Sequence, residues 1–344
     1  MKTEKWKTVR LGDVCEKGSS NIAQNEVTDN NGEYPIYGAA GFIKNVDFYK
    51  QDKPYIGIVK DGAGVGRVSV HPAKSSLIGT MQYIFPKENI DIKFLAEFLK
   101  YQNLSRFYTG ATIPHIYFKD YQNIPLKLPS LQKQKHISAV LDKCTALIAK
   151  HKLMLEKYDT LVKSRFIEMF GDPRINSKNL PSVKFIDVIK LQRGFDLPVQ
   201  ERDSTGTINV YGSNGVLGKH NEIKVKGPGI VTGRSGTLGK VYYVLEDYWP
   251  LNTTLFSVDT HGNNVIYLKY LLEAFELERF TEGAGVPTLN RNIVHEKEII
   301  NAPLELQQQF AAFVQQIDKS KFAVQKSLEK AETLYKSLMQ EYFG

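Results

Sequence analysis

Residues 134–171 read QKHISAVLDKCTALIAKHKLMLEKYDTLVKSRFIEMFG, with no proline and no glycine before Gly171. Apolar side chains recur at every third or fourth position, which predicts a helix with one broad apolar face. About 35 helical residues span roughly 50 Å, far beyond the three or four turns usual in a globular domain. A helix of this length needs a partner for its apolar face. The apolar positions are Ile137, Val140, Leu141, Cys144, Leu147, Ile148, Met154, Leu155, Tyr158, Leu161, Val162, Phe166 and Met169.

The same pattern returns at the end of the chain, where residues 308–344 read QQFAAFVQQIDKSKFAVQKSLEKAETLYKSLMQEYFG. Both stretches end in Phe-Gly, at residues 170–171 and 343–344, an offset of 173. Each helix could cap the core of a separate domain, or the two could pair with each other. Because a cap rarely needs ten turns, their length favours an antiparallel pair. Three polar residues interrupt the second apolar face: Ser320, Lys321 and Ser327.

The repeat extends over the whole chain. Residues 9–14 (VRLGDV) match residues 183–188 (VKFIDV), and residues 34–43 (YPIYGAAGFI) match residues 208–217 (INVYGSNGVL), at an offset of 174. Solenoid repeats have periods of about 20–50 residues. A period this much longer predicts duplication of a whole domain together with its long helix.

Each globular half has short β-rich stretches punctuated by Gly, Asn and Asp, with one or two short helices. This pattern predicts a mixed α/β fold of the α+β class. We expect two similar globular domains separated by two long antiparallel helices that form a coiled-coil spacer. The expected limits are residues 1–130 and 172–303 for the two domains, and residues 131–171 and 304–344 for the two helices.

Composition narrows the class of protein. The chain has 344 residues, is 42% hydrophobic and carries a formal net charge of +8, all of it in the first half. A basic protein suggests a polyanionic partner, although the excess alone is weak evidence. No apolar run approaches the 18–20 residues that cross a membrane, and the N-terminus lacks a secretory signal, so we expect a cytoplasmic protein. Cys15 and Cys144 are expected to be buried hydrophobes rather than a disulfide.

A glycine-rich turn between two apolar strands is the first functional candidate in each half. The two copies are PYIGIVKDGAGVGRVSV from Pro54 and PGIVTGRSGTLGKVYYV from Pro228. A nucleotide-binding loop is disfavoured, because neither turn has the G-x-G-x-x-G spacing and neither opens a helix. A tight hairpin with glycines at positive φ is the ordinary explanation.

Basic residues flank both turns and raise a second possibility. Glycine lets backbone N–H groups approach a phosphate, and Lys or Arg can neutralise it or read guanine in the major groove. The turns are therefore either plain hairpins or DNA contacts. The candidate DNA-binding residues here are Lys60, Arg67, Arg234, Ser235 and Lys240.

Two further pairs of equivalent loops carry candidates. Tyr37 and Tyr211, each followed by glycine, are either packing residues or contacts to sugar and base. The loops RFYTGATIPHI (residues 106–116) and RFTEGAGVPTL (residues 279–289) hold polar groups near a rigid proline. His115 has Thr288 as its counterpart, so it is not a catalytic base common to both halves. The candidates in and after these loops are Thr112, His115, Asn290 and Arg291.

Enzymatic readings find little support. Glu222-Ile223-Lys224 supplies the E-x-K fragment of a nuclease, with Asp196 as a distant companion, but the Pro-Asp dipeptide is missing. A methyltransferase would need a glycine-rich cofactor loop and a Pro-Pro-Tyr motif, and the chain has no Pro-Pro pair. No His and Cys spacing indicates a zinc site. We therefore expect no catalytic residue and no metal site in this chain.

The order of these motifs, present twice, resembles the specificity subunit of type I restriction-modification systems. The resemblance rests on the YG…G loop, the KDGAGVGRV-type turn, the TGAT-x-P-like loop and the start of each long helix, where a proline precedes several glutamines (IPLKLPSLQKQ and NAPLELQQQ). It covers essentially the whole chain. It implies that each globular part is a target recognition domain, that the helices form the spacer, and that this subunit is not catalytic. The family has no fixed set of base-reading residues, so the candidates above rest on chemistry and equivalent position.

The resemblance also implies partners and cofactors. Two modification subunits would bind S-adenosylmethionine and methylate adenine at N6 in each half-site of double-stranded DNA. Two restriction subunits, with ATP and Mg²⁺ for translocation, can join them. This chain itself would bind no cofactor.

A paired spacer would set the distance between the two half-sites. Two further helical turns would move one domain about 11 Å, close to three base pairs at 3.4 Å each. A stand-alone sequence-specific or architectural DNA-binding protein is the competing function, but it has less need of a long helix pair with spare apolar surface. Binding to modification subunits distinguishes the two.

Overall fold

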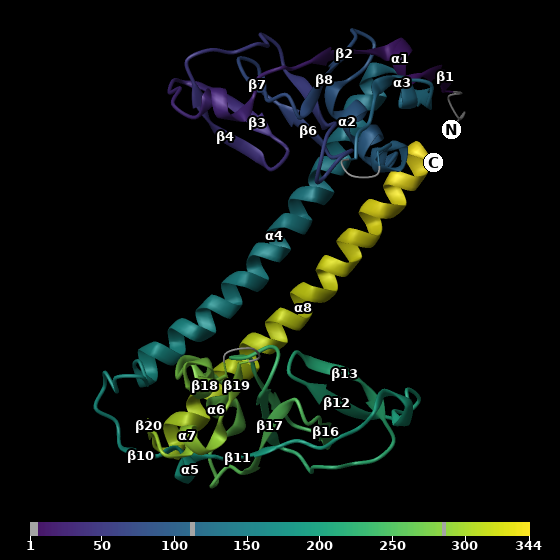
Figure 1. The fold of residues 1–344 in the computed structure, drawn as a ribbon. Helices are drawn as coiled ribbons and strands as arrows, with labels where there is room; N and C mark the ends of the chain where they lie inside the picture. The colour runs from purple at the N-terminus through teal and green to yellow at the C-terminus, as the bar shows by residue number, and fades with distance from the viewer. Residues whose placement is uncertain (1–5, 111–113, 284–286) are drawn as a thin grey trace. The chain divides into compact units, whose positions relative to one another are not determined.

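The computed structural model describes residues 6–110, 114–283 and 287–344 (Figure 1). The chain divides into two compact units: unit 1 comprises Met1–His151 and Ser327–Gly344, and unit 2 comprises Lys152–Lys326. The repeat placed the domain limits at the starts and ends of the long helices. The compact units group residues by contact, and they divide both helices near their midpoints, because each half-helix packs on the globular domain of its own unit. The limits derived from the repeat stay a prediction.

Unit 1 is built on a four-stranded antiparallel sheet with strand order β2-β8-β5-β6. A smaller sheet, β4-β3-β7, contains a parallel pair, β3 with β7. Helix α2 packs on β5 and β6 over a core that includes Ile56, Phe94 and Phe98. The strands are β1 Lys7–Arg10, β2 Cys15–Ser19, β3 Tyr34–Gly38, β4 Gly41–Val46, β5 Tyr55–Val59, β6 Val68–His71, β7 Ser76–Leu77, β8 Met81–Pro86 and β9 Pro125–Leu128, and the short helices are α1 Leu11–Val14, η1 Gln24–Val27, α2 Ile92–Tyr101, η2 Leu104–Phe107 and α3 Phe118–Tyr121.

Unit 2 repeats this architecture. Its main sheet has the order β11-β17-β14-β15 and its smaller sheet the order β13-β12-β16, again with one parallel pair, β12 with β16. Helix α6 packs on β14 and β15 over a core that includes Ile230, Leu255 and Leu268. The strands are β10 Ser182–Lys184, β11 Lys190–Arg193, β12 Ile208–Gly212, β13 Gly215–His220, β14 Gly229–Gly233, β15 Val241–Val244, β16 Tyr248–Pro250, β17 Thr254–Asp259, β18 Thr281–Glu282, β19 Thr288–Leu289 and β20 Glu298–Ile300, and the short helices are α5 Phe185–Val188, η3 Val199–Glu201, α6 Val265–Ala274, η4 Leu277–Phe280 and α7 Arg291–His295.

The two long helices are α4, Leu131–Phe170, and α8, Leu304–Phe343, with 40 residues each. At 1.5 Å per residue each is about 60 Å long. In unit 1, Ile137 near the start of α4 shares a core with Phe343 at the end of α8. In unit 2, Phe166 near the end of α4 packs on Phe310 near the start of α8, with ring centroids 5.5 Å apart. The helices therefore pair antiparallel, as predicted, and they lie side by side in Figure 1.

One interruption of the apolar face has a structural explanation. Lys321 of α8 donates from Nζ to Asp159 Oδ1 of α4 at 2.5 Å. The Asp159 side chain is 60% exposed, so this ion pair joins the two helices at the edge of their contact and adds little to stability.

A buried glutamine attaches each long helix to its globular domain. Gln134 accepts from the backbone N–H of Asp91, the N-cap residue of α2, and Gln307 accepts from that of Asn264, the N-cap residue of α6. Each glutamine also donates to the carbonyl five residues before it, Pro129 or Ala302. These contacts explain the glutamine near the start of each long helix, since it ties the first turn of that helix to the start of the domain helix.

Two smaller expectations concern cysteine and the membrane. Cys15 and Cys144 are buried, free thiols, as predicted. Within residues 6–110, 114–283 and 287–344, no helix combines the length and hydrophobicity that crossing a bilayer requires.

Candidate nucleic-acid interface

The glycine-rich turn of unit 1, residues 60–67, joins β5 to β6 as the predicted hairpin. Two consecutive backbone N–H groups, of Lys60 and Asp61, donate to Thr80 O at 3.0 and 3.2 Å. On the other side, the carbonyl of Lys60 accepts from Ile116 N at 2.9 Å. The turn is thus held between the start of β8 and the loop that contains His115.

The turn of unit 2, residues 234–240, joins β14 to β15 and is held in the same way. The N–H groups of Arg234 and Ser235 donate to Thr253 O at 2.9 and 3.2 Å. The carbonyl of Arg234 accepts from Leu289 N at 2.8 Å. The structure therefore equates Lys60 with Arg234 and Asp61 with Ser235.

Glycine is required in both turns. Gly62 and Gly236 have φ of +81° and +82°, and Gly66 and Gly239 have φ of +85° and +76°. Residues other than glycine rarely adopt this left-handed region. The glycines thus serve the hairpin geometry, and the flanking side chains remain available for binding.

In unit 1, the candidate basic residues Lys60 and Arg67 are the first and last residues of the turn. Lys60 Nζ is 3.7 Å from Asp61 Oδ2, and both side chains are about 30% exposed. Arg67 is exposed and donates from Nη1 to Ala39 O at 2.8 Å, which ties the turn to the segment after β3. His115 lies next to the turn through its contact with Asp61, whereas Thr112 lies outside the described residues.

In unit 2, three arginines line one pocket of about 330 Å³ at the turn. Arg193 ends β11, Arg234 opens the turn and Arg291 opens α7. Such a cluster of guanidinium donors is suited to phosphate oxygens or to the acceptors of guanine. The structure also places Asn290, Thr288 and one carboxylate, that of Glu282, in the lining of this pocket.

The remaining unit 2 candidates have local contacts. Lys240 Nζ donates to Asn214 Oδ1 at 2.8 Å, which joins the turn to the hairpin of β12 and β13. Asn290 caps α7 by accepting from Asn292 N, and it also donates to Glu282 at 2.8 Å. Asn290 therefore has a structural role within the loop, and Lys240 remains exposed.

Tyr37 and Tyr211 pack inside their units. The Tyr37 ring lies 4.3 Å from that of His71, and the Tyr211 ring lies 5.9 Å from that of Tyr248. Burial also raises the pKa of the Tyr211 phenol. These contacts support the packing interpretation of both residues over a contact to DNA.

Sequence reasoning missed two residues that the structure brings to these sites, Asp61 and Arg193. Asp61 follows Lys60 in the turn and aligns with Ser235 in the repeat. This alignment could have identified it as a candidate. Arg193 had no such signal, because only the pairing of β11 with β17 places it near Arg234.

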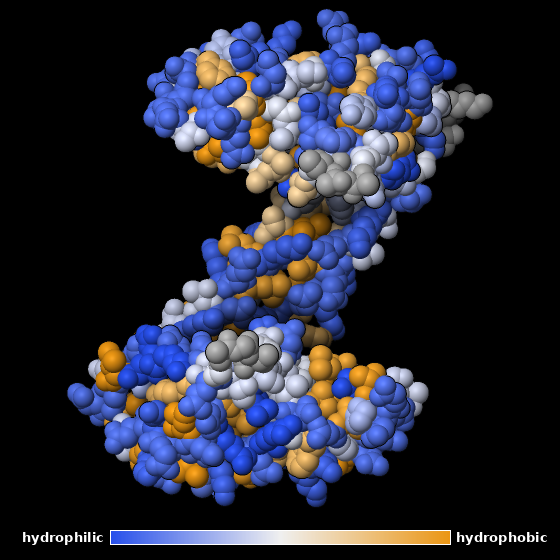
Figure 2. Space-filling model, viewed as in Figure 1, coloured by the Kyte–Doolittle hydropathy of each residue, from blue (hydrophilic) through white to orange (hydrophobic). Residues whose placement is uncertain are grey.

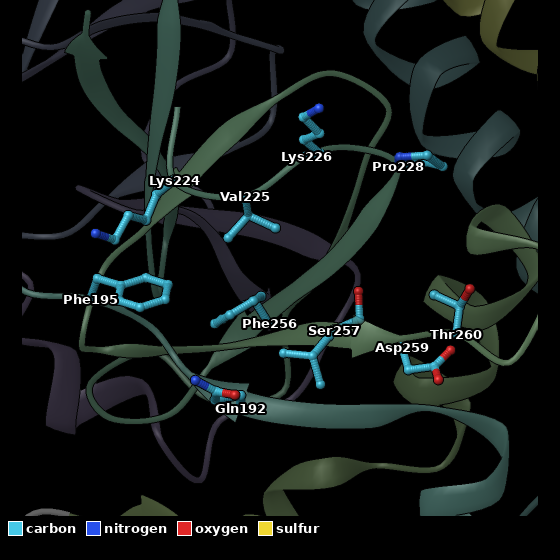
Figure 3. Close-up of a pocket in the computed structure, with 11 residues that line it drawn as sticks. Gln192, Phe195, Lys224, Val225, Lys226, Pro228, Phe256, Ser257, Asp259 and Thr260 are labelled. Carbon is cyan, nitrogen blue, oxygen red and sulfur yellow. The ribbon is translucent and has the colours of Figure 1, made fainter. Parts of the chain in front are cut away.

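A separate cavity of about 570 Å³ lies on the other face of the unit 2 sheet (Figure 3). Gln192 of β11 and Phe256 of β17 pair with each other and line this cavity, whereas their neighbours Arg193 and Leu255 line the pocket with the three arginines. In the lining of this cavity, Lys224 Nζ lies 4.9 Å from the centroid of the Phe195 ring. Because successive residues of a strand point to opposite faces of the sheet, this cavity is not part of the turn site. Among the residues that the structure describes, no group of His, Cys, Asp and Glu could hold a metal ion.

Comparison with known proteins is consistent with the duplicated architecture. The family model for the type I restriction modification DNA specificity domain matches twice, at residues 3–157 and 178–332. The chain belongs to this family. The two matches include both glycine-rich turns and both proline-containing loops. The candidate sites therefore lie within the two specificity domains.

Relatives with curated names are type I specificity subunits. A putative specificity subunit of Mycoplasma pneumoniae is 23% identical over an alignment of 367 positions, which covers 98% of this chain and 96% of that protein. The EcoDI specificity subunit of Escherichia coli is 26% identical over 161 residues, but this match covers 46% of this chain and only 35% of the relative.

Solved structures show the same fold. The S subunit from M. genitalium matches with a TM-score of 0.72 at 16% identity, over 100% of this chain and 97% of that one. A chain from a study of complex assembly and conformational transition in a type I R-M system matches with a TM-score of 0.59 at 13% identity, over 98% and 97%. At these identities the structures support the fold of the specificity subunit and no residue role.

Proposed function

We propose that this chain reads a DNA target in two separated half-sites, one for each unit, and positions modification subunits on it. The observation that carries the proposal is the recurrence of one construction in both units. In each, a glycine turn is held between the start of a central strand and a proline-containing loop, but the side chains differ. A shared backbone with unlike side chains is suited to reading two unlike half-sites.

Positive charge at the turns supports DNA as the ligand. Lys60 and Arg67 flank one turn, and Arg234 and Lys240 flank the other. In unit 2, Arg193 and Arg291 add to Arg234 in one pocket. Phosphate contacts by such residues would supply affinity, and contacts to base edges would supply selectivity.

Apolar side chains on the long helices support a protein partner over a stand-alone function. Figure 2 shows hydrophobic atoms on the visible face of the two helices. These side chains remain exposed after α4 and α8 have paired, and partners of the modification type would cover them. Beyond the first residue of each helix, the exposed large apolar residues are Leu147, Leu153, Leu161, Ile167, Phe322 and Leu334, between 45% and 62% exposed.

The proposed assembly assigns the chemistry to other chains. Two modification subunits, one for each copy of the repeat, bind S-adenosylmethionine and methylate adenine at N6. Restriction subunits with ATP and Mg²⁺ join where cleavage follows. This chain is non-catalytic, carries no cofactor and works in the cytoplasm. The relatives named as type I specificity subunits support this division of roles.

A methylome tests the proposal directly. A host without adenine methylation would express this chain with its neighbouring modification subunit, and its genome would be sequenced with detection of N6-methyladenine. We expect methylation within a split motif that has two unlike half-sites and one fixed gap. The modification subunit expressed alone is the control and should leave the motif unmethylated. Methylation at a continuous motif, or equal methylation without this chain, would contradict the proposal.

A further inference from the structure

The two turns can be compared residue by residue because their backbone contacts are equivalent. Asp61 and His115 form a β-bridge in unit 1, and Ser235 and Thr288 form the corresponding bridge in unit 2. The same backbone positions thus hold a carboxylate with an imidazole in one unit and two hydroxyl groups in the other.

The Asp61–His115 pair of unit 1 has a defined geometry. Asp61 Oδ1 lies 2.6 Å from His115 Nδ1, and the two side chains are 29% and 38% exposed. An ionised carboxylate can only accept hydrogen bonds, so Nδ1 of His115 must carry the proton. In the neutral ring, Nε2 is then an acceptor with a fixed orientation.

A carboxylate without a neighbouring cation is unfavourable at a DNA-binding surface, because it repels the phosphate groups of DNA. Here Lys60 lies 3.7 Å from Asp61, and Arg67 follows at the end of the same turn. These cations offset the carboxylate, so the pair can approach a duplex without a net negative charge at the turn.

We infer that Asp61 and His115 read one base pair of the first half-site by selecting an exocyclic amino group. His115 Nε2 accepts from adenine N6 or cytosine N4 in the major groove, and Asp61 is the positioning residue that sets the ring orientation and tautomer. Only these two bases present an amino donor there. This inference rests on the proposed function of the turns as DNA-reading sites.

Unit 2 offers the opposite chemistry at the equivalent place. Ser235 and Thr288 replace the Asp61–His115 pair, and Arg193, Arg234 and Arg291 line a pocket together with Thr288 and Glu282. Arginine donors match the N7 and O6 acceptors of guanine. The second half-site should therefore favour guanine where the first favours adenine or cytosine.

The experiment exchanges the pair in the full chain, in complex with its modification subunit. The double variant Asp61→Ser with His115→Thr installs the unit 2 pair in unit 1. Binding is selected from duplex libraries randomised at both half-sites. We expect a loss of about tenfold or more in preference at one base pair of the first half-site, with the second half-site unchanged. Glu88→Ser, which removes an acid beyond the far end of β8, is the matched control and should change neither preference.

The variant Asp61→Asn distinguishes two roles of Asp61. This residue either orients the His115 ring for base contact or only stabilises the turn. The asparagine amide can donate to Nδ1 or accept from it, so either tautomer of His115 becomes possible. Preference at that base pair should then broaden to include guanine or thymine, whose major-groove edges present acceptors. If Asp61 only stabilises the turn, the variant should show no new base preference.

The outcomes distinguish this inference from the proposed function. A wild-type complex without two selective half-sites would overturn the proposed function and this inference together. A selective wild type would leave the proposed function standing, and the inference would then fail if the double variant kept every first-half preference or lost all of them equally. If the double variant does not fold, the near-isosteric Asp61→Asn decides the matter through its base preference alone.

Discussion

At the residue scale, Lys60 and Arg234 occupy the same position of the two turns but have unlike surroundings. Lys60 lies beside the single carboxylate of Asp61, whereas Arg234 shares a pocket with two further arginines and with Glu282. Arginine presents a fixed fork of donors, and lysine is a point charge. The two turns should therefore differ in how strongly one side chain determines the recognised base.

Arg234→Ala tests this difference. We expect binding at the second half-site to weaken by about 1–3 kcal/mol, because a bidentate contact to one base pair is lost. The sequence preference at the first half-site should stay intact. Lys226→Ala, which removes a positive charge at the cavity of Figure 3, is the control and should leave both preferences unchanged. Equal loss of selectivity at both half-sites would contradict independent reading by the two units.

His71 should make unit 1 sensitive to acid. Burial lowers the pKa of His71 to about 4 from 6.5, and its Nε2 lies 2.7 Å from Ser69 Oγ. The unfolded chain binds the proton at the higher pH, so stability is full above about pH 6.5 and is lost as pH falls toward 4. The loss attributable to this residue is on the order of 2–3 kcal/mol.

Urea unfolding of the full chain at pH 7.5 and pH 5 would measure this loss. The variant His71→Gln should lose less stability between these two pH values than the wild type does. His136→Gln, at an exposed position of α4, should behave like the wild type. If His71→Gln retained the whole pH response, other groups would be responsible.

At the scale of elements, each long helix depends on one buried glutamine. Gln134 and Gln307 are 0% and 1% exposed, and each bonds the backbone at the start of a domain helix. A buried backbone group left without a partner costs far more than a solvated one. The helices are therefore attached by specific polar contacts as well as by apolar packing.

Gln307→Leu should destabilise unit 2 by roughly 2–4 kcal/mol, because it leaves the N–H of Asn264 and the carbonyl of Ala302 without their partner. Gln308→Leu, at the adjacent exposed position, should cost little. Thermal unfolding of both full-length variants provides the measurement. Equal melting temperatures would show that apolar packing alone holds the helix start.

At the scale of the whole molecule, α4 and α8 run through both units, so any change in their length acts on the two together. The spacer hypothesis predicts that this length sets the gap between half-sites. Seven added residues lengthen a helix by about 10.5 Å, close to three base pairs, and rotate it by only about 20°.

Inserting seven residues in both helices, after His151 and after Lys326, should lengthen the permitted gap by about three base pairs. The preserved apolar register keeps the helices paired. Insertion into α4 alone should disrupt the pair and abolish selective binding. Methylome sequencing reports the gap directly, and a gap unchanged by the double insertion would exclude the spacer hypothesis.

Binding of the whole complex to DNA should depend steeply on salt. Each phosphate contact by Lys or Arg releases condensed counterions, so the logarithm of affinity falls linearly with the logarithm of salt concentration. Titration of a duplex with the cognate motif at several salt concentrations gives the slope. Arg234→Ala should make the slope shallower if this residue also contacts phosphate. A flat response of the wild type would contradict a phosphate-binding surface.

Local pattern determined much of this protein. Periodic apolar residues specified both long helices, and the repeat specified two domains of one fold, because helical periodicity and duplication are properties of the linear chain. Glycines between apolar strands specified the hairpins, since positive φ at Gly62 and Gly236 has few alternatives to glycine. The candidate residues Lys60 and Arg234 followed from these turns.

Tertiary structure decided what the pattern left open. Pairing of β11 with β17 brings Arg193 to Arg234, and the bridge between turn and loop sets Asp61 against His115. The antiparallel contact of α4 with α8 explains why Lys321 interrupts an apolar face. Such contacts join residues far apart in sequence, and their partners depend on strand register and helix packing, which no local pattern contains.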